Sequence, residues 1–220
     1  MLKIVVFDSG YGGELFADKL EEEIPVVEVI RVIDWRNAEE ILKNPRRARK
    51  AAKEALRPYL GKVDLIIFAN QLLTLTSLRY FRRKYKKQAF VGLGLERPRK
   101  VKEQTVVLTT RAVCRTMNYQ HYLLKVKGKI ATVCLDTWPE MIDDGELTDS
   151  DVNKMAGECL AGLKKKPGRV VLACSHFCDI KDGIRRTFGH NVNICDDVEE
   201  TIREVYLALN LRGICKPRER

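Results

Sequence analysis

Three adjacent side chains, Cys174, Ser175 and His176, have the residue types needed for acid–base chemistry. They follow four apolar residues, 170–173, which are typical of a short buried strand. Such a strand presents a thiol, a hydroxyl and an imidazole at the carboxyl edge of a sheet, where open α/β folds bind ligands. A thiol becomes a proton acceptor when neighbouring groups lower its pKa. Free cysteines are also common core residues, so simple packing is the competing interpretation.

Polar side chains also follow three other predicted strands, at residues 3–7, 63–68 and 105–108. These side chains are Asp8 and Ser9, Asn70 and Gln71, and Thr110. Because the carboxyl ends of parallel strands lie at one edge of a sheet, we expect these residues to form candidate ligand-binding sites.

Strands alternate with helices along the whole chain. Strands are expected at 3–7, 26–33, 63–68, 89–93, 105–108, 130–134, 170–173 and 192–194. Helices are expected at about 13–23, 45–60, 74–86, 113–124, 150–164, 180–187 and 198–210. This alternation predicts an α/β protein with mostly parallel strands and right-handed crossovers.

The pattern also repeats within the chain. Residues 3–9 resemble residues 104–110, and residues 64–70 resemble residues 169–175. The repeat predicts two similar, mostly parallel α/β lobes that face each other across a cleft. We expect an N-terminal-type lobe at 1–95 and about 195–220, and a second lobe at 96–194. Any α/β chain has strands at such intervals, but a polar residue at each strand end favours duplication.

Composition limits the class of protein. The chain has 220 residues, of which 45% are hydrophobic and 32% charged, so it can form a core. It has no apolar run of about 20 residues, which a membrane span needs, and its N-terminus does not resemble a signal peptide. Its seven cysteines lack the spacing of a disulfide framework, so we expect a cytoplasmic protein. The net charge of +10 favours anionic partners, either small carboxylates or nucleic acid.

Two basic segments, 46–50 and 79–87, have a structural and a functional interpretation. The second interleaves aromatic and cationic residues, as nucleic-acid surfaces do. A solvated helix face with Tyr80, Phe81 and Tyr85 packed inward is the interpretation we favour, because charge runs have low specificity. Nucleic-acid binding is kept as the non-enzyme alternative. No metal site is predicted, because cysteines 174 and 178 lack paired zinc-ligand spacing.

Several segments together resemble a known family. Residues 7–13, FDSGYGG, resemble the FDSGxGG opening of bacterial glutamate racemases. Residues 64–73 stand where that family has strand-CNTA, residues 107–119 resemble its TxxTxxSxxY segment, and residues 172–177 resemble its GCTHYP motif. The order agrees over roughly residues 3–206. The resemblance implies a two-lobed Asp/Glu racemase fold and cofactor-independent chemistry at Cα of a small amino acid or dicarboxylate, in that family a peptidoglycan precursor.

The resemblance also implies roles for individual residues. In that family two cysteines exchange protons on opposite faces of Cα, and Cys174 matches the second of them. His176 matches the histidine that assists this cysteine, and Asp8 matches an aspartate beside the first cysteine. The remaining matches imply substrate contacts by Ser9, Asn70, Thr110 and Ser175, and Gln71, at the position of a family threonine, is a further candidate for substrate binding. No cofactor or metal is implied, and a homodimer is left open.

The chain departs from the family pattern at several positions. Ala69 replaces the first cysteine, and Gln71 replaces the threonine of CNTA. The acidic residue of the family falls on Ile142, with Asp143 and Glu140 as shifted candidates.

We therefore expect racemisation to be impaired or altered. Ala69 could be an engineered change, or the chain could be a one-sided, single-cysteine enzyme such as a decarboxylase. It could also bind a ligand or nucleic acid without catalysis. Asp8 is the candidate to replace the missing base.

Overall fold

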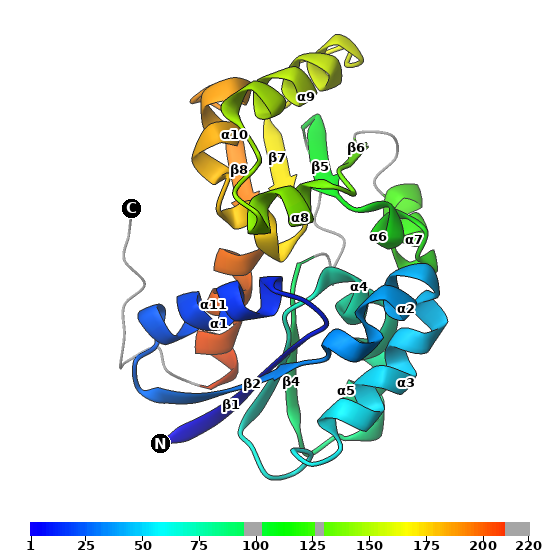
Figure 1. Cartoon of the computed structure of the whole chain (residues 1–220), viewed down its shortest axis with the longest axis vertical. Coiled ribbons are helices and arrows are strands. Elements are labelled where there is room, and N and C mark those ends of the chain that lie inside the picture. Colours follow the sequence, from blue (N-terminus) through cyan, green and yellow to red (C-terminus); the bar gives the residue numbers. More distant parts are fainter. Residues whose placement is uncertain (95–102, 126–129, 210–220) are drawn as a thin grey trace. The chain divides into compact units, whose positions relative to one another are not determined.

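The computed structural model describes residues 1–94, 103–125 and 130–209 (Figure 1). The chain divides into two compact units. Unit 1 comprises Met1–Glu96 and Val198–Arg220, and unit 2 comprises Arg97–Asp197. Residues 95–102, where the predicted lobe boundary falls, and residues 210–220 lie outside the described residues. Each unit contains a four-stranded parallel sheet with helices, so the predicted α/β class is confirmed.

The sheet of unit 1 has the strand order β2-β1-β3-β4. Its strands are β1 (Leu2–Asp8), β2 (Val27–Ile33), β3 (Leu65–Phe68) and β4 (Ala89–Gly92). Its helices are α1 (Gly12–Glu23), α2 (Ala38–Lys43), α3 (Pro45–Leu56), α4 (Gln71–Leu73), α5 (Arg79–Lys84) and α11 (Asp197–Ala208). A 3-10 turn, η1 (Trp35–Asn37), precedes α2, and a π-helical turn, η2 (Thr74–Leu78), joins α4 to α5. The central strands β1 and β3 are apolar and almost wholly buried, as expected for a covered parallel sheet.

Aromatic rings fill much of the core of unit 1. The Phe68 ring lies 5.8 Å from the Phe7 ring and 5.3 Å from the Phe81 ring, both edge to face. Phe81 is fully buried, so its predicted inward packing is confirmed. Such pairs add about 0.5–1.5 kcal/mol beyond the burial of their area. They hold α5 against β3.

The sheet of unit 2 has the order β6-β5-β7-β8. Its strands are β5 (Thr105–Thr109), β6 (Ile130–Cys134), β7 (Arg169–Leu172) and β8 (Asn193–Asp196). Its helices are α6 (Arg111–Cys114), α7 (Met117–Lys125), α8 (Trp138–Asp143), α9 (Asp149–Ala161) and α10 (Lys181–Phe188), with a 3-10 turn η3 (Ser175–Cys178). The core includes Trp138, whose ring meets Phe177 edge to face at 6.3 Å. Trp138 is therefore a core residue of this unit.

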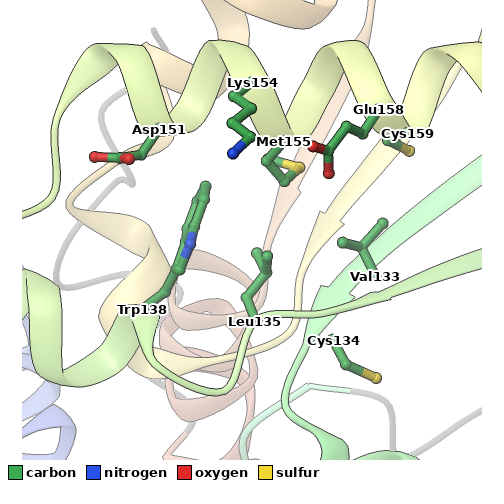
Figure 2. A pocket seen from close by; sticks show the side chains of 9 residues that line it. All are labelled: Val133, Cys134, Leu135, Trp138, Asp151, Lys154, Met155, Glu158 and Cys159. Atoms are coloured by element: carbon green, nitrogen blue, oxygen red, sulfur yellow. The ribbon is translucent and has the colours of Figure 1, made fainter.

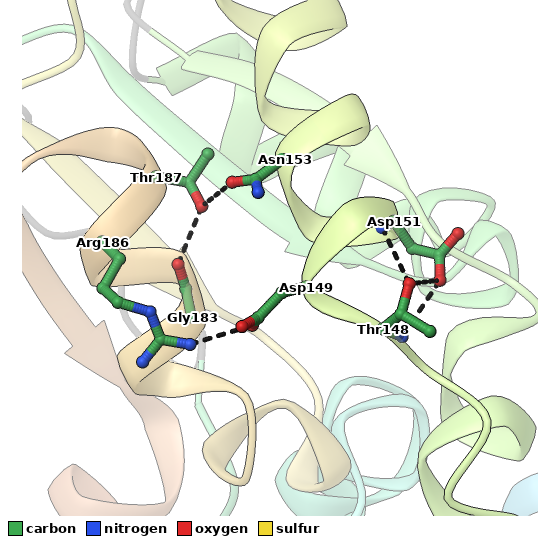
Figure 3. A network of polar contacts seen from close by, with 7 residues as sticks. All are labelled: Thr148, Asp149, Asp151, Asn153, Gly183, Arg186 and Thr187. Atoms are coloured by element: carbon green, nitrogen blue, oxygen red, sulfur yellow. Dashed lines mark hydrogen bonds and ion pairs between the residues drawn. The ribbon is translucent and has the colours of Figure 1, made fainter.

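Polar contacts fix the start of α9 and its neighbour α10 (Figure 3). Thr148 and Asp151 form a capping box, in which each side chain satisfies a backbone N–H of the other. Arg186 on α10 donates to Asp149 at 2.9 Å, and Thr187 donates to Asn153 at 2.9 Å. Thr148 is thus the N-cap of α9.

The shared strand order supports the predicted internal repeat, but the register corrects its alignment. In unit 1, Phe7 pairs with Phe68, and the N–H of Ala69 donates to the Phe7 carbonyl at 2.9 Å. In unit 2, Leu108 pairs with Leu172, and Ala173 makes the corresponding bond at 2.9 Å. Ala69 is therefore equivalent to Ala173, and residue 70 to residue 174. The expected match of 64–70 with 169–175 was wrong by one residue.

Some helices differ from those expected. The helix expected at 74–86 begins at Gln71 and contains the π turn. The helix expected at 113–124 is interrupted, because the Thr116 side chain donates to the Val113 carbonyl at 2.8 Å and accepts from the Tyr119 N–H at 3.2 Å. The short helices α2 and α8 were not predicted.

Candidate functional site

Asp8 is the central polar residue at the carboxyl edge of the unit 1 sheet. It ends β1 and is 1% exposed. Its Oδ1 accepts hydrogen bonds from the Ser9 N–H at 2.5 Å and from Asn70 Nδ2 at 2.9 Å. Its Oδ2 is buried and has no hydrogen-bond partner within the described residues. The edge thus holds a carboxyl group with one oxygen that is unpartnered in the described part of the chain.

Burial decides how Asp8 titrates. Burial raises the pKa of Asp8 to about 7, and the hydrogen bonds from Ser9, Asn70 and the Gly10 backbone only partly oppose it. A carboxyl group with this pKa can both donate and accept a proton near neutral pH. The role of Asp8 as an acid or base stays a prediction.

In the glycine motif after Asp8, position 13 requires glycine for a steric reason. A Cβ on Gly13 would lie 2.4 Å from Asp8 Cβ and 2.8 Å from Ile33 Cδ1. No atom lies within 4 Å of the corresponding point on Gly10. The start of α1 therefore packs directly against Asp8, and only glycine at position 13 permits this.

Asn70 joins Asp8 to the next helix. Its Nδ2 donates to Asp8, while its Oδ1 caps α4 by accepting from the Leu73 N–H at 3.1 Å. Both ends of the amide are thereby oriented. Ala69 and Gln71 on either side are buried, and Ser9 is 6% exposed. The structure thus brings four of the predicted polar residues, Asp8, Ser9, Asn70 and Gln71, to one sheet edge.

The carboxyl edge of the unit 2 sheet holds a chain of three titratable groups. Cys174 Sγ lies 3.5 Å from His176 Nδ1, and His176 Nε2 lies 3.3 Å from Asp143 Oδ2. Cys174 follows β7, His176 lies in η3, and Asp143 ends α8. Of the two acidic candidates, Asp143 is the one that contacts the histidine. A nucleophile or base oriented in series in this way is typical of activated thiols.

Burial and pairing have opposite effects on the pKa values of His176 and Asp143. Burial lowers the pKa of His176, and the Asp143 carboxylate opposes that effect. Burial raises the pKa of Asp143, and His176 opposes it. A neutral imidazole that donates from Nε2 to Asp143 leaves Nδ1 free to accept the thiol proton of Cys174.

Thr110 and Ser175 lie near these groups in the chain and the sheet. Thr110 follows β5, the neighbour of β7, and its side chain makes no hydrogen bond to cap α6. Ser175 begins η3 and is 3% exposed. Next to Thr110, the N–H and side chain of Arg111 both bind Asp136, at 2.6 and 3.2 Å. Sequence reasoning missed this pair, because no motif connects an exposed arginine to an acid 25 residues later.

A cavity of about 350 Å³ lies elsewhere in unit 2 (Figure 2). In Figure 2, Asp151, Lys154 and Glu158 from α9 stand opposite Trp138 and Leu135. None of the predicted site residues lines this cavity. The candidate chemistry therefore resides at the strand edges.

The described part of the chain offers neither a metal centre nor a membrane-spanning helix. No group of three or more His, Cys, Asp or Glu side chains there is arranged to hold a metal ion. None of the helices in residues 1–94, 103–125 and 130–209 has both the length and the hydrophobicity of a membrane span.

Comparison with known proteins identifies the class. No family model matches the chain. The structure resembles the aspartate racemase of Picrophilus torridus with a TM-score of 0.59 and 15% identity, covering 96% of this chain and 95% of the other. It resembles a glutamate racemase of Bacillus anthracis with a TM-score of 0.78 and 18% identity, covering 97% and 84%. The chain has the Asp/Glu racemase fold, as the resemblance predicted.

The sequence comparison narrows this class. A glutamate racemase of Clostridium perfringens is 27% identical over 208 residues, which cover 90% of this chain and 80% of the relative. The chain is thus similar in sequence to glutamate racemases, which are amino-acid isomerases.

Proposed function

We propose that the chain catalyses cofactor-independent proton transfer at Cα of a small amino acid or dicarboxylate, with glutamate as the first substrate to test. The observation that carries this proposal is the Cys174–His176–Asp143 series of contacts in a chain similar in sequence to glutamate racemases. Cytoplasmic location is part of the same proposal.

Cys174 acts as the acid/base on one face of Cα. Neutral His176 accepts the thiol proton of Cys174, and Asp143 stabilises the imidazolium that forms. The thiolate then takes the α-proton and becomes a thiol, while the electron pair of the broken C–H bond remains on Cα.

We assign the second proton transfer to Asp8, in place of the thiol that Ala69 lacks. With a pKa of about 7, Asp8 is partly protonated at neutral pH and can give its proton to the carbanion. The reverse reaction uses the Asp8 carboxylate as base and the Cys174 thiol as acid. Thr110 and Ser175 bind the substrate carboxylate and its neighbours, and Ser9, Asn70 and Gln71 bind the substrate beside Asp8.

The reaction is expected to be slow. Loss of a well-placed general acid or base typically costs about 10²–10⁴-fold in rate. A carboxyl group in a position served by a thiol in the family should recover only part of that loss.

Exchange of the α-proton in D₂O tests the proposal with D- and L-glutamate and with D- and L-aspartate. Exchange and inversion from both hands support two acid/base groups. Exchange from one hand only shows one-sided chemistry and removes Asp8 from its assigned role. Binding without exchange contradicts catalysis and leaves a ligand-binding protein.

Substitutions of cysteine test whether the thiol of Cys174 carries out the exchange of the α-proton. Cys174→Ala should abolish exchange from at least one hand, whereas Cys178→Ala, four residues later, is the matched thiol control. Full activity in Cys174→Ala would show that the assignment of the thiol is wrong.

A further inference from the structure

One segment of unit 1 contains all the excess charge of the protein. Residues 43–87 contain 14 Lys and Arg but only two acidic residues, Glu54 and Asp64. The other 175 residues contain 26 basic and 28 acidic residues. The net charge of +10 is therefore a local property of this segment.

Helices α3 and α5, which lie about 30 residues apart in sequence, bring these cations together. Arg49 and Lys53 on α3 lie 5.1 and 4.6 Å from the centre of the Tyr80 ring on α5, and Lys84 lies 5.7 Å from it. Arg49 also donates to the Thr76 carbonyl at 3.0 Å. In Figure 1 the two helices lie side by side in the same unit. We call this surface the α3–α5 basic face; it comprises Arg49, Lys53 and Lys84 around Tyr80, together with Lys50, Arg79 and Arg83, which are exposed on the same two helices.

The basic face corrects part of the sequence prediction. Phe81 packs inward, but Tyr80 is only partly buried and lies among cations. The ammonium groups of Lys84 and Lys53 lower the pKa of Tyr80 by pairing with its hydroxyl oxygen. The Tyr80 ring thus contacts cations from both helices and is not a core residue.

Among the residues that the structure describes, few acidic side chains contact the α3–α5 basic face. Glu54 contacts Lys50 at 3.9 Å, and both side chains are mostly exposed, so the pair is weak. Asp64 accepts a hydrogen bond from the Lys3 N–H at 2.7 Å, away from α3 and α5. Cations crowded in this way repel one another, and an external polyanion would remove that repulsion.

The character of the basic face distinguishes a nucleic acid from a membrane. Within the described residues, the exposed large hydrophobic side chains are Met1, Tyr11, Val26, Trp35, Met117, Leu124 and Leu207. None of them belongs to α3 or α5. Amphipathic helices that lie in the membrane interface insert apolar side chains beside their cations, and α3 and α5 expose no large hydrophobic side chain for insertion.

We propose that the α3–α5 basic face binds nucleic acid through its phosphate backbone, independently of sequence. The cations around the Tyr80 ring occupy the space that a stacked base would need, so phosphates rather than bases are contacted. This binding is separate from the acid–base groups and does not depend on the proposed catalysis.

Fluorescence anisotropy with a labelled 24-base-pair DNA duplex tests the proposal on the full chain. Binding should be of micromolar order in low salt and fall about 10³-fold between 50 and 200 mM salt, if all six cations contact phosphates. The same titration with phosphatidylserine vesicles is the comparison. Binding to vesicles but not to the duplex would overturn the proposal, as would no binding to the duplex at 50 mM salt.

A matched pair of variants locates the site. The triple variant Lys50→Gln, Arg83→Gln, Lys84→Gln should reduce the salt dependence by about three phosphate contacts and weaken binding at least about tenfold. The control triple Lys164→Gln, Lys165→Gln, Lys166→Gln removes the same charge from exposed positions in unit 2. Equal loss in both triples would show a general charge effect and contradict the assignment, provided that both give the circular dichroism spectrum of the parent. Cys174→Ala should bind the duplex like the parent.

Discussion

At the scale of single residues, Asp8 links the pH dependence of stability to the proposed chemistry. Its pKa in the folded protein, about 7, lies above the ordinary value of 3.8 because the carboxyl group is buried. Between these two pH values the folded state binds more protons than the unfolded state. The free energy of unfolding should therefore fall as the pH rises from about 4 to 7.

Replacing Asp8 by Asn should remove this fall. Asn stays neutral, and its Oδ1 can still accept from Ser9 and Asn70. The variant should gain stability relative to the parent between pH 5 and pH 8, by at most about 4 kcal/mol for three pKa units. Urea unfolding of the parent and of the variant at pH 5 and at pH 8 measures the difference in unfolding free energy. The same pH dependence in parent and variant would contradict the assignment of the titration to Asp8.

The charge of Asp143 should raise the pKa of His176. The Asp143 carboxylate opposes the burial that lowers the pKa of His176, so Asp143→Asn should lower that pKa further. The NMR titration of the His176 ring should move to lower pH, and proton exchange should slow by about 10–10²-fold. Glu140→Gln on the same helix is the control and should leave the titration unchanged. An unshifted His176 in Asp143→Asn would show that the 3.3 Å contact has no functional role.

Ala69 offers a gain-of-function experiment. If position 69 is where the family has its first thiol, Ala69→Cys should raise racemisation at least about tenfold, since a thiol is the better acid/base for this position. Ala173→Cys adds the same atoms at the equivalent position of the other sheet and should give no increase. The measurement is the loss of optical rotation from L-glutamate. Equal rates in both variants would remove position 69 from the mechanism.

At the scale of elements, the start of α1 determines the position of Asp8. Gly13→Ala should push the new Cβ into Asp8 and Ile33, because separations of 2.4 and 2.8 Å are too short for any real contact between carbon atoms. We expect a loss of about 1–3 kcal/mol in unfolding free energy and slower proton exchange. Gly10→Ala meets no atom within 4 Å and serves as the control. Equal behaviour of the two variants in urea unfolding would contradict this steric account.

The strands were easier to predict from sequence than the short helices. Buried runs such as 65–68 and 170–172 are unambiguous, because they are apolar without interruption and end in polar residues. Helix α8 has six residues and packs through Trp138, so its hydrophobic period is too short to recognise. For that reason the sequence left Asp143 and Glu140 as two candidates for the acidic residue of the family, and it predicted no contact of either with His176. The one-residue error in the repeat had a similar cause, since apolar residues on both faces of a buried strand leave no pattern that fixes the register.

Candidate site residues were predictable where a strand end presented them. Asp8, Asn70, Cys174 and His176 all follow strands and were all predicted. The contact of Tyr80 with cations from α3 was not, because it depends on how two helices pack. Tertiary contacts of that kind have no signal in a single sequence.

At the scale of the whole molecule, the last helix returns to unit 1. The Tyr206 hydroxyl on α11 donates to the Glu23 carbonyl at the end of α1, at 2.6 Å. Tyr206→Phe should therefore lower the free energy of unfolding by about 0.5–1.5 kcal/mol. The exposed Tyr11→Phe in the same unit should change it by less than about 0.5 kcal/mol. Thermal unfolding of both variants, followed by circular dichroism, would separate them, and an equal effect would show that the α11 bond contributes nothing.

The path of the chain through its two units also bears on how such proteins diverge. Residues 97–197 are one uninterrupted stretch, while the residues before and after it belong together. Two crossovers in a gene are therefore enough to exchange unit 2, which contains Cys174, between relatives. Unit 1, which contains Asp8, is unchanged by such an exchange. The residues at positions 69 and 174 lie in different units, so they can be inherited independently.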